Sequence, residues 1–281
     1  MLTTRRKIAL ARTVQKAVMA GRGAWCKGPR ARVQRRGVAW DLDLREGIDF
    51  AIWLMGTFEP ATVAACARLV RPGDIVFDIG ANIGAHTLHL ARAVGATGRV
   101  HAFEPTDWAR EKLAANLALN PDLAARVVIV PAMLVAMRGA APPPLYASWP
   151  LDSAVAAHPL HGGRKMPATG ANAVTLDDYV ASAGLTRLDF IKLDIDGFEG
   201  GALRGARATL ARFRPRMVLE LSPHQLAEQG DSIEDLTALL DAMSYRLATL
   251  SGRALPRDGA ALRSLIMPGA SLNALARVEV A

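Results

Sequence analysis

Short apolar segments alternate with longer helical patterns from residue 74 to the end of the chain. Five of these segments have the length and composition of buried strands: 75–77, 100–103, 127–130, 188–193 and 217–221. Helical periodicity follows in 83–94, 107–119, 198–212 and 232–243, and two last strands are predicted at 245–250 and 262–267. Strands separated by helices of this length indicate a parallel sheet with helices on both faces. A doubly wound α/β domain is therefore expected.

The first 72 residues follow a different pattern. A basic amphipathic helix is predicted from Ile8 to Met19. Strand-like alternation from Val38 to Arg45, followed by the apolar run Ile52–Met55, predicts a small β-ribbon. Pro60 then starts a helix over 61–69. The expected division is a basic arm (1–36), a β-ribbon with a lead-in helix (37–72) and a main domain (73–281).

A long stretch rich in proline and glycine interrupts the main domain between residues 139 and 173. It is too long for an ordinary connection, and loops of this length usually cover or bind a ligand. It also contains four aromatic or imidazole side chains: Tyr146, Trp149, His158 and His161. We predict that this inserted loop contacts the substrate, with a plain surface insertion as the alternative.

The positive charge of the chain is concentrated at its N-terminus. Residues 1–40 contain eleven of the 34 Lys and Arg residues and none of the 26 Asp and Glu residues, which leaves residues 41–281 with a net charge of −3. Nucleic-acid binding by the main domain is therefore not indicated. Three roles stay open for the arm: a helix that packs on the protein, peripheral contact with an anionic membrane, and a targeting segment.

Composition narrows the class of protein. Hydrophobic residues make up 51% of the chain and charged residues 21%, which excludes a disordered or collagen-like protein. No uncharged apolar run approaches the roughly 18 residues of a membrane-spanning helix. The two cysteines, Cys26 and Cys66, form neither a disulfide framework nor a metal-binding motif. A cytoplasmic enzyme, with peripheral membrane contact through residues 1–36 left open, is expected.

The segment from Asp78 to Gly84 follows the first strand of the main domain and has the pattern D-x-G-x-N-x-G. Glycines let the backbone turn tightly and approach a ligand. An acid before the glycines would repel a pyrophosphate, but it suits S-adenosylmethionine, which carries a sulfonium, an ammonium and no phosphate. Asn82 is acceptable at the middle position because Asn tolerates positive φ. We predict that Asp78, Gly80, Asn82 and Gly84 bind this cofactor.

Glu104 is the second candidate cofactor ligand. It lies in Phe103-Glu104-Pro105, 24 residues after Gly80, where the second strand ends. A carboxylate at this place can accept hydrogen bonds from both ribose hydroxyls. The same feature occurs in NAD-binding proteins, so Glu104 alone does not identify the cofactor.

In combination, three motifs resemble the FkbM family of S-adenosylmethionine-dependent methyltransferases. They are residues 72–84, Phe103-Glu104-Pro105 and residues 189–199, and the resemblance extends over about residues 50–222. It implies a Rossmann-like class I methyltransferase fold with a seven-stranded sheet. It also implies O-methylation of a hydroxyl on a sugar, glycolipid or natural product. The chain departs from the family at Asp196, where relatives often have Glu, and at 132–134, where no acid is available for the adenine amino group.

Candidate catalytic residues follow the fourth and fifth predicted strands. Methyl transfer depends on alignment of the reactants, and a general base adds roughly 10²–10⁴-fold. We predict catalytic roles for Asp194, His224 and Lys192, and place Asp194 beside the cofactor as well. Helix capping is the alternative for Glu199, and a buried structural role is the alternative for Glu220.

No metal is predicted, although two patterns resemble metal sites. Asp194-Ile195-Asp196 is a D-x-D sequence, but hard cations need about six oxygen ligands and only part of such a set is visible. His86 and His89 are three residues apart on a predicted helix, where packing is favoured over metal binding.

Three other functions remain as alternatives. An NAD-dependent oxidoreductase is disfavoured by Asp78 and by the missing second glycine. A D-x-D metal-dependent glycosyltransferase is disfavoured because that chemistry does not require the glycine loop. A non-catalytic scaffold or membrane-surface module is favoured only if the loop binds no cofactor.

Overall fold

The computed structural model describes residues 4–24, 28–140, 145–151 and 163–279. At its centre is a seven-stranded sheet in the order β12-β13-β11-β10-β3-β4-β5. The strands are β3 (Ile75–Ile79), β4 (Arg99–Phe103), β5 (Val127–Val130), β10 (Phe190–Leu193), β11 (Arg216–Leu221), β12 (Tyr245–Thr249) and β13 (Leu272–Val278). Only β13 is antiparallel to its neighbours. This arrangement confirms the predicted doubly wound, seven-stranded sheet.

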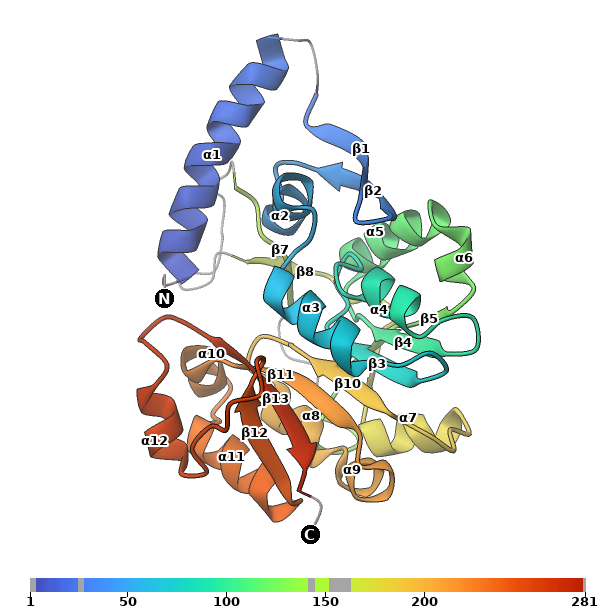
Figure 1. Cartoon of the computed structure of the whole chain (residues 1–281), viewed down its shortest axis with the longest axis vertical. Helices are drawn as coiled ribbons and strands as arrows, with labels where there is room; N and C mark the ends of the chain where they lie inside the picture. The colour runs from blue at the N-terminus through green and yellow to red at the C-terminus, as the bar shows by residue number, and fades with distance from the viewer. Residues whose placement is uncertain (1–3, 25–27, 141–144, 152–162, 280–281) are drawn as a thin grey trace.

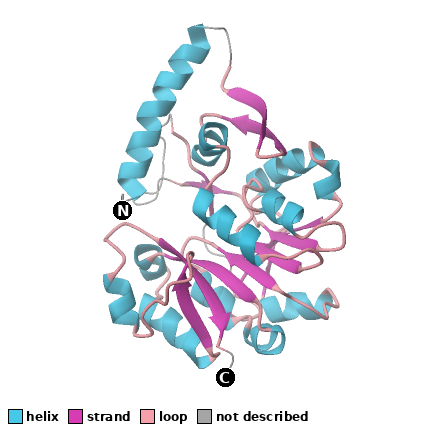
Figure 2. Cartoon of the chain, in the orientation of Figure 1, coloured by secondary structure: helices cyan, strands magenta, loops and turns pink. Residues whose placement is uncertain are grey.

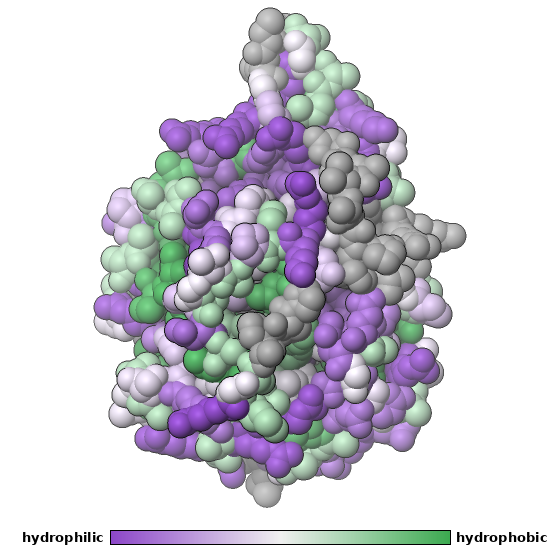
Figure 3. Space-filling model, turned by 180° about the vertical axis from the view of Figure 1, so that it is seen from behind, coloured by the Kyte–Doolittle hydropathy of each residue, from purple (hydrophilic) through white to green (hydrophobic). Residues whose placement is uncertain are grey.

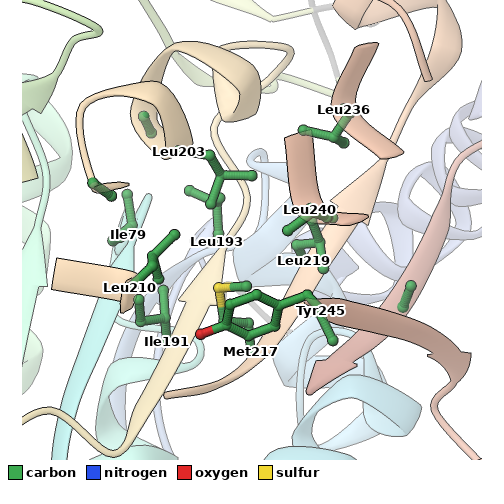
Figure 4. Packing of buried hydrophobic residues seen from close by; sticks show 14 of the residues in the cluster. Ile79, Ile191, Leu193, Leu203, Leu210, Met217, Leu219, Leu236, Leu240 and Tyr245 are labelled. Carbon is green, nitrogen blue, oxygen red and sulfur yellow. The ribbon is translucent and has the colours of Figure 1, made fainter. Parts of the chain in front are cut away.

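Helices cover both faces of this sheet (Figures 1 and 2). One face carries α3 (Pro60–Leu69), α4 (Thr87–Ala93) and α5 (Asp107–Ala118). The other carries α7 (Leu176–Ser182), α8 (Glu199–Arg204), α9 (Arg207–Phe213), α10 (Pro223–Glu228) and α11 (Ile233–Ala242). On that second face, Ile191, Leu193, Met217 and Leu219 pack under helical leucines (Figure 4). Alternate strand residues therefore face opposite cores, as burial on both faces requires.

The N-terminal segment adds a helix and a ribbon to this sheet. Helix α1 (Thr4–Ala24) is followed by the antiparallel pair β1 (Arg30–Arg35) and β2 (Val38–Asp43). Arg36 and Gly37 both have positive φ, as a two-residue type I′ hairpin turn requires. Inward-facing Val38, Trp40 and Leu42 are at most 1% exposed and anchor the ribbon on the protein.

The expectation of a strand at Ile52–Met55 is wrong. The ribbon strand β2 pairs with β1, and residues Gly47–Met55 form helix α2. A short continuous apolar run fits a strand or a buried helix equally well by pattern alone. Here the buried Asp49 accepts a hydrogen bond from the Asp43 amide and pairs with Lys112, contacts that hold the segment in a helix.

The expectation of a strand at 262–267 is also wrong. Helix α12 (Gly259–Ser264) occupies the first half of this segment, and the last strand is β13. The Asp258 side chain accepts from the Ala261 amide at 2.7 Å, which is an N-cap contact. The predicted helix over 198–212 is interrupted as well, because α8 ends at Arg204 and α9 begins at Arg207.

The proline- and glycine-rich insertion contains short strands where the structure describes it. Strands β7 (Leu145–Ser148) and β8 (Arg164–Met166) pair with each other, and β9 (Asn172–Val174) pairs with β6 (Ala132–Leu134). The carboxylate of Glu46 accepts from the Ser148 hydroxyl and the Trp149 amide. His158 and His161 lie outside the described residues. The small helix α6 (Pro121–Ala124) precedes β5.

Helix α1 packs on the protein along part of its length. Val14, Val18 and Met19 contact the core under the ribbon, and the Gln15 amide donates to the Leu44 carbonyl.

The face of the molecule turned away in Figure 1 shows a band of hydrophilic side chains across its upper part (Figure 3). Membrane contact and targeting by residues 1–36 remain predictions.

In the described ranges, no single helix is long and apolar enough to cross a membrane. The two helices α2 and α3 together have sufficient length and apolar composition, but they are bent by 75° relative to each other. Both bury residues in the cores described above, among them Phe50, Ile52 and Cys66.

Candidate active site

The glycine loop after β3 lies against the end of β10, at the point where the strand order reverses. Gly80 has φ +84, and a Cβ there would stand 1.9 Å from the Asp194 carbonyl oxygen. Asn82 has φ +47 and Gly84 has φ +92, so the three positions that were predicted from the motif all adopt positive φ. A side chain at Gly80 is excluded by backbone contact, and the loop is therefore held directly on the neighbouring strand.

Glu104 reaches the same loop from the end of β4. Its Oε2 accepts from the Asn82 amide at 2.9 Å, and its Oε1 accepts from the amide and hydroxyl of Thr106. Burial raises the pKa of this carboxyl, while the hydrogen bonds from Thr106 and Asn82 oppose that increase. The structure thus places the predicted ribose-binding acid beside the predicted cofactor loop.

Asp78, Lys192 and Asp194 form a buried charge cluster beneath the loop. The Lys192 ammonium is 3.2 Å from Asp194 Oδ2, 3.9 Å from Asp78 Oδ1 and 3.4 Å from the Gly80 carbonyl oxygen. Thr87 donates to Asp78 Oδ2 at 2.6 Å, whereas Asp78 Oδ1 has no hydrogen-bond partner among the described residues. The cluster ties β3, β10 and the start of α4 together.

Lys192 is positively charged in this environment. Burial alone would lower its pKa, but Asp194 and Asp78 outweigh burial and raise the pKa above its ordinary value. A protonated ammonium cannot accept a proton from a substrate hydroxyl. Lys192 is therefore suited to electrostatic stabilisation and not to the role of general base, and its catalytic role stays a prediction.

Further acids surround the end of β10. Asp196, with φ +54, accepts from the Gln225 amide at 2.6 Å, and burial with the nearby Asp194 raises its pKa to about 8. Glu199 accepts from the Ile195 amide at 2.9 Å, and burial raises its pKa to about 7. Burial also raises the pKa of Glu220 well above its ordinary value. These raised pKa values lessen the negative charge that the acids at this strand end carry.

His224 stands apart from the charge cluster in its contacts. It lies at the start of α10, and its Nδ1 is 3.2 Å from the Ser222 hydroxyl. Burial lowers its pKa, so the imidazole is neutral near pH 7. A neutral imidazole can accept a proton, which keeps His224 chemically suited to the predicted role.

The structure brings no described group of three or more His, Cys, Asp or Glu side chains into a geometry that could hold a metal ion. The D-x-D residues are instead engaged with Lys192 and Gln225. The two histidines of the α4 region have different partners: His86 faces Glu59, and His89 is 3.3 Å from the Thr57 hydroxyl. Glu59 was not among the residues selected from the sequence.

Glu199→Gln is expected to gain stability relative to the wild type as the pH rises from 4.5 to 7. The folded wild type retains a proton on Glu199 that the unfolded chain releases above about pH 4.5, so its unfolding free energy falls with pH until about pH 7. The slope from one such proton is at most about 1.4 kcal/mol per pH unit. Urea unfolding at pH 5 and pH 7.5 measures this difference. An equal gap between variant and wild type at both pH values would contradict the assigned protonation.

Comparisons with known proteins agree with these motifs. The family model described as the methyltransferase FkbM domain matches residues 78–247, which is more than half of the chain. A curated relative, the 31-O-demethyl-FK506 methyltransferase FkbM of Streptomyces tacrolimicus, is 32% identical over 161 residues. This match covers 48% of the chain and 60% of the relative, less than two thirds of that protein's length.

The solved structures that are similar to this chain include two methyltransferases. The FkbM methyltransferase of Methylobacillus flagellatus is 19% identical with a TM-score of 0.43, covering 73% of this chain and 43% of that one. An S-adenosylmethionine-dependent O-methyltransferase of Thermotoga maritima is 16% identical with a TM-score of 0.43, covering 92% of this chain and 82% of that one. The family match, together with the loop and strand-end motifs that the structure assembles, shows that the chain belongs to the FkbM family of methyltransferases.

Proposed function

We propose that this chain transfers a methyl group from S-adenosylmethionine to a hydroxyl group of a sugar, glycolipid or natural product. The observation that carries the proposal is the set of carboxylates around the glycine loop. Asp78, Glu104 and Asp194 lie beside it, with one buried cation, Lys192, among them. Such a site suits a cationic ligand with a ribose and disfavours the pyrophosphate of NAD.

The carboxylates of this site suit the ribose hydroxyls and the positive charge of the cofactor. The Glu104 carboxylate already accepts from the Asn82 amide and from the amide and hydroxyl of Thr106, and the remaining lone pair, on Oε2, is available to a ribose hydroxyl. Asp78 has a buried oxygen without a hydrogen-bond partner in the described chain, 3.9 Å from the Lys192 ammonium. When bound, S-adenosylmethionine supplies an electrophilic methyl group. The side chain of Asp194, 23% exposed at the strand end, is suited to orient the acceptor hydroxyl.

Two considerations support oxygen as the methylated atom. His224 and Asp194 can each accept the proton of a hydroxyl group, as a general base does. The proposal involves no covalent intermediate on either residue. The Streptomyces relative is named as an O-demethyl-FK506 methyltransferase, which describes that protein. The proposal specifies the methyl acceptor only by its chemical class, which is an alcohol.

S-Adenosylhomocysteine is expected to stabilise the protein against heat. At 100 times its dissociation constant the stabilisation is about 2.7 kcal/mol, which raises Tm by about 5 °C for a chain of this size. Differential scanning fluorimetry with S-adenosylhomocysteine, NAD and UDP-glucose plus Mn²⁺ provides the test. A shift with NAD or with the nucleotide sugar, and none with S-adenosylhomocysteine, would overturn the proposal in favour of the corresponding alternative.

A further inference from the structure

Glu59 adopts an unfavourable backbone conformation beside the candidate active site. It immediately precedes Pro60, yet its φ is +46, a region that is costly for a residue with a side chain and more so before proline. Its carboxylate does not cap α3, the helix that it begins. Local strain of this kind persists where surrounding contacts hold it, and it is frequent at functional sites.

Two residues far away in the sequence, Asn273 and His86, lie beside the Glu59 carboxylate. The Asn273 amide donates to Glu59 Oε2 at 3.1 Å and also lies 3.0 Å from the Thr62 hydroxyl. His86 Nε2 is 3.6 Å from the same Oε2, too far for a hydrogen bond. His86 is only 5% exposed, and neither of its ring nitrogens has a hydrogen-bond partner in the described chain. The carboxylate is therefore positioned by β13 and by the residue that precedes α4.

Glu59 differs from the other carboxylates of the site in its exposure and in its charged neighbours. Asp78 is fully buried, Asp194 is paired with Lys192, and Glu104 binds the loop and Thr106. The Glu59 side chain is 27% exposed, and no Lys or Arg among the described residues lies within ion-pair distance of it. Burial opposes its ionisation, but His86 and Lys192 hold its pKa down to about 2. Glu59 is therefore an ionised carboxylate that is partly exposed to solvent.

Glu104 and Glu59 lie near different residues of the segment that follows β3. Glu104 binds the loop at Asn82, and Glu59 meets the residue two positions after Gly84, His86. The cofactor also has two polar ends, a ribose diol and an amino-acid group with a positively charged ammonium. An ionised carboxylate near His86, four residues along the segment from the contact with Glu104, matches the ammonium in charge and is separate from the predicted ribose-binding acid.

We propose that Glu59 binds the α-ammonium group of S-adenosylmethionine, with His86 and Asn273 acting as positioning residues. The inference rests on the proposed function, because it assumes that the cofactor occupies the glycine loop. The charge of Lys192 does not prevent this binding, since Asp78 and Asp194 neutralise it from two sides. A hydroxyl of the methyl acceptor is the competing occupant, and the test below separates the two.

The test compares two ligands that differ in the amino-acid group. S-Adenosylhomocysteine carries the ammonium, whereas 5′-methylthioadenosine has the same adenosine and thioether without it. For Glu59→Gln, which keeps the oxygen that accepts from Asn273, we expect about a ten- to a hundredfold weaker Kd for S-adenosylhomocysteine. The Kd for 5′-methylthioadenosine is expected to change less than twofold. Isothermal titration calorimetry measures both, and Glu111→Gln, an exposed acid on α5, is the matched control.

Each outcome has a distinct meaning. Equal weakening of both ligands would show that Glu59 only supports the fold and would overturn the inference. Unchanged binding of both would also overturn it and leave the acceptor as the occupant of Glu59. Glu59→Asp, which keeps the charge, is expected to recover part of the lost affinity for S-adenosylhomocysteine alone. Failure of the wild type to bind either ligand would instead overturn the proposed function itself.

Discussion

Gly80→Ala is expected to abolish measurable binding of S-adenosylhomocysteine and to destabilise the protein by more than about 3 kcal/mol. The new Cβ would lie 1.9 Å from the Asp194 carbonyl oxygen and 3.0 Å from its carbonyl carbon. Both are backbone atoms, so no side-chain rotation relieves the contact. Either the loop or the end of β10 must move, and both contribute to the proposed cofactor site. Positive φ adds roughly 1–2 kcal/mol for a residue with a Cβ.

A matched glycine separates the clash from the cost of positive φ. Gly230 has φ +76, and a Cβ there would meet no atom within 4 Å. Gly230→Ala is expected to lose only about 1 kcal/mol and to bind S-adenosylhomocysteine like the wild type. Urea unfolding and calorimetric titration at low temperature, where both variants are folded by circular dichroism, give the comparison. Wild-type affinity in folded Gly80→Ala would show that the ligand does not use this loop.

Glu104→Gln is expected to weaken S-adenosylhomocysteine binding by roughly ten- to a hundredfold, because hydrogen bonds to a charged group contribute about 1.5–3 kcal/mol. Glutamine has one acceptor oxygen, whereas Glu104 receives donors on both oxygens, from Asn82 and from Thr106. The variant would therefore leave one buried donor facing an amide NH₂ group. The same loss is expected for 5′-methylthioadenosine, which retains the ribose.

Equilibrium titration of both ligands into Glu104→Gln, with Glu111→Gln as the control, measures this effect. The shared loss distinguishes Glu104 from Glu59, for which only the ligand with an ammonium is expected to suffer. Unchanged affinity in Glu104→Gln would remove Glu104 from the ribose site, even if the loop still binds the adenosine.

The conformation of the glycine loop could be predicted from the sequence because its signals are local. Gly80, Asn82 and Gly84 stand where one strand ends, and each needs a backbone conformation that few residue types accept. The position of Glu104 follows from the parallel strand order, since adjacent parallel strands end at the same edge of the sheet. The pairing of Asp78 with Lys192 was not predicted, because it depends on the register between β3 and β10, in which the two residues are direct neighbours.

Other parts of the site depend on contacts that no local pattern contains. Glu59 meets His86 and Asn273 only because α3 packs over the sheet beside β13. Helix α2 resembles a strand in sequence, and the buried Asp49 that holds it takes its partner from α5, 63 residues away. The protonation of Lys192 also follows from tertiary neighbours, since burial alone would favour the neutral amine.

The most direct test of the proposed cofactor site is a crystal structure of the protein grown with S-adenosylhomocysteine. We expect the ribose hydroxyls within hydrogen-bond distance of the Glu104 carboxylate and the homocysteine chain along the loop from Gly80 to Gly84. The amino group is expected to face Glu59. A ligand that binds away from this loop, or lies on it with its ribose turned from Glu104, would contradict the assignment of the site.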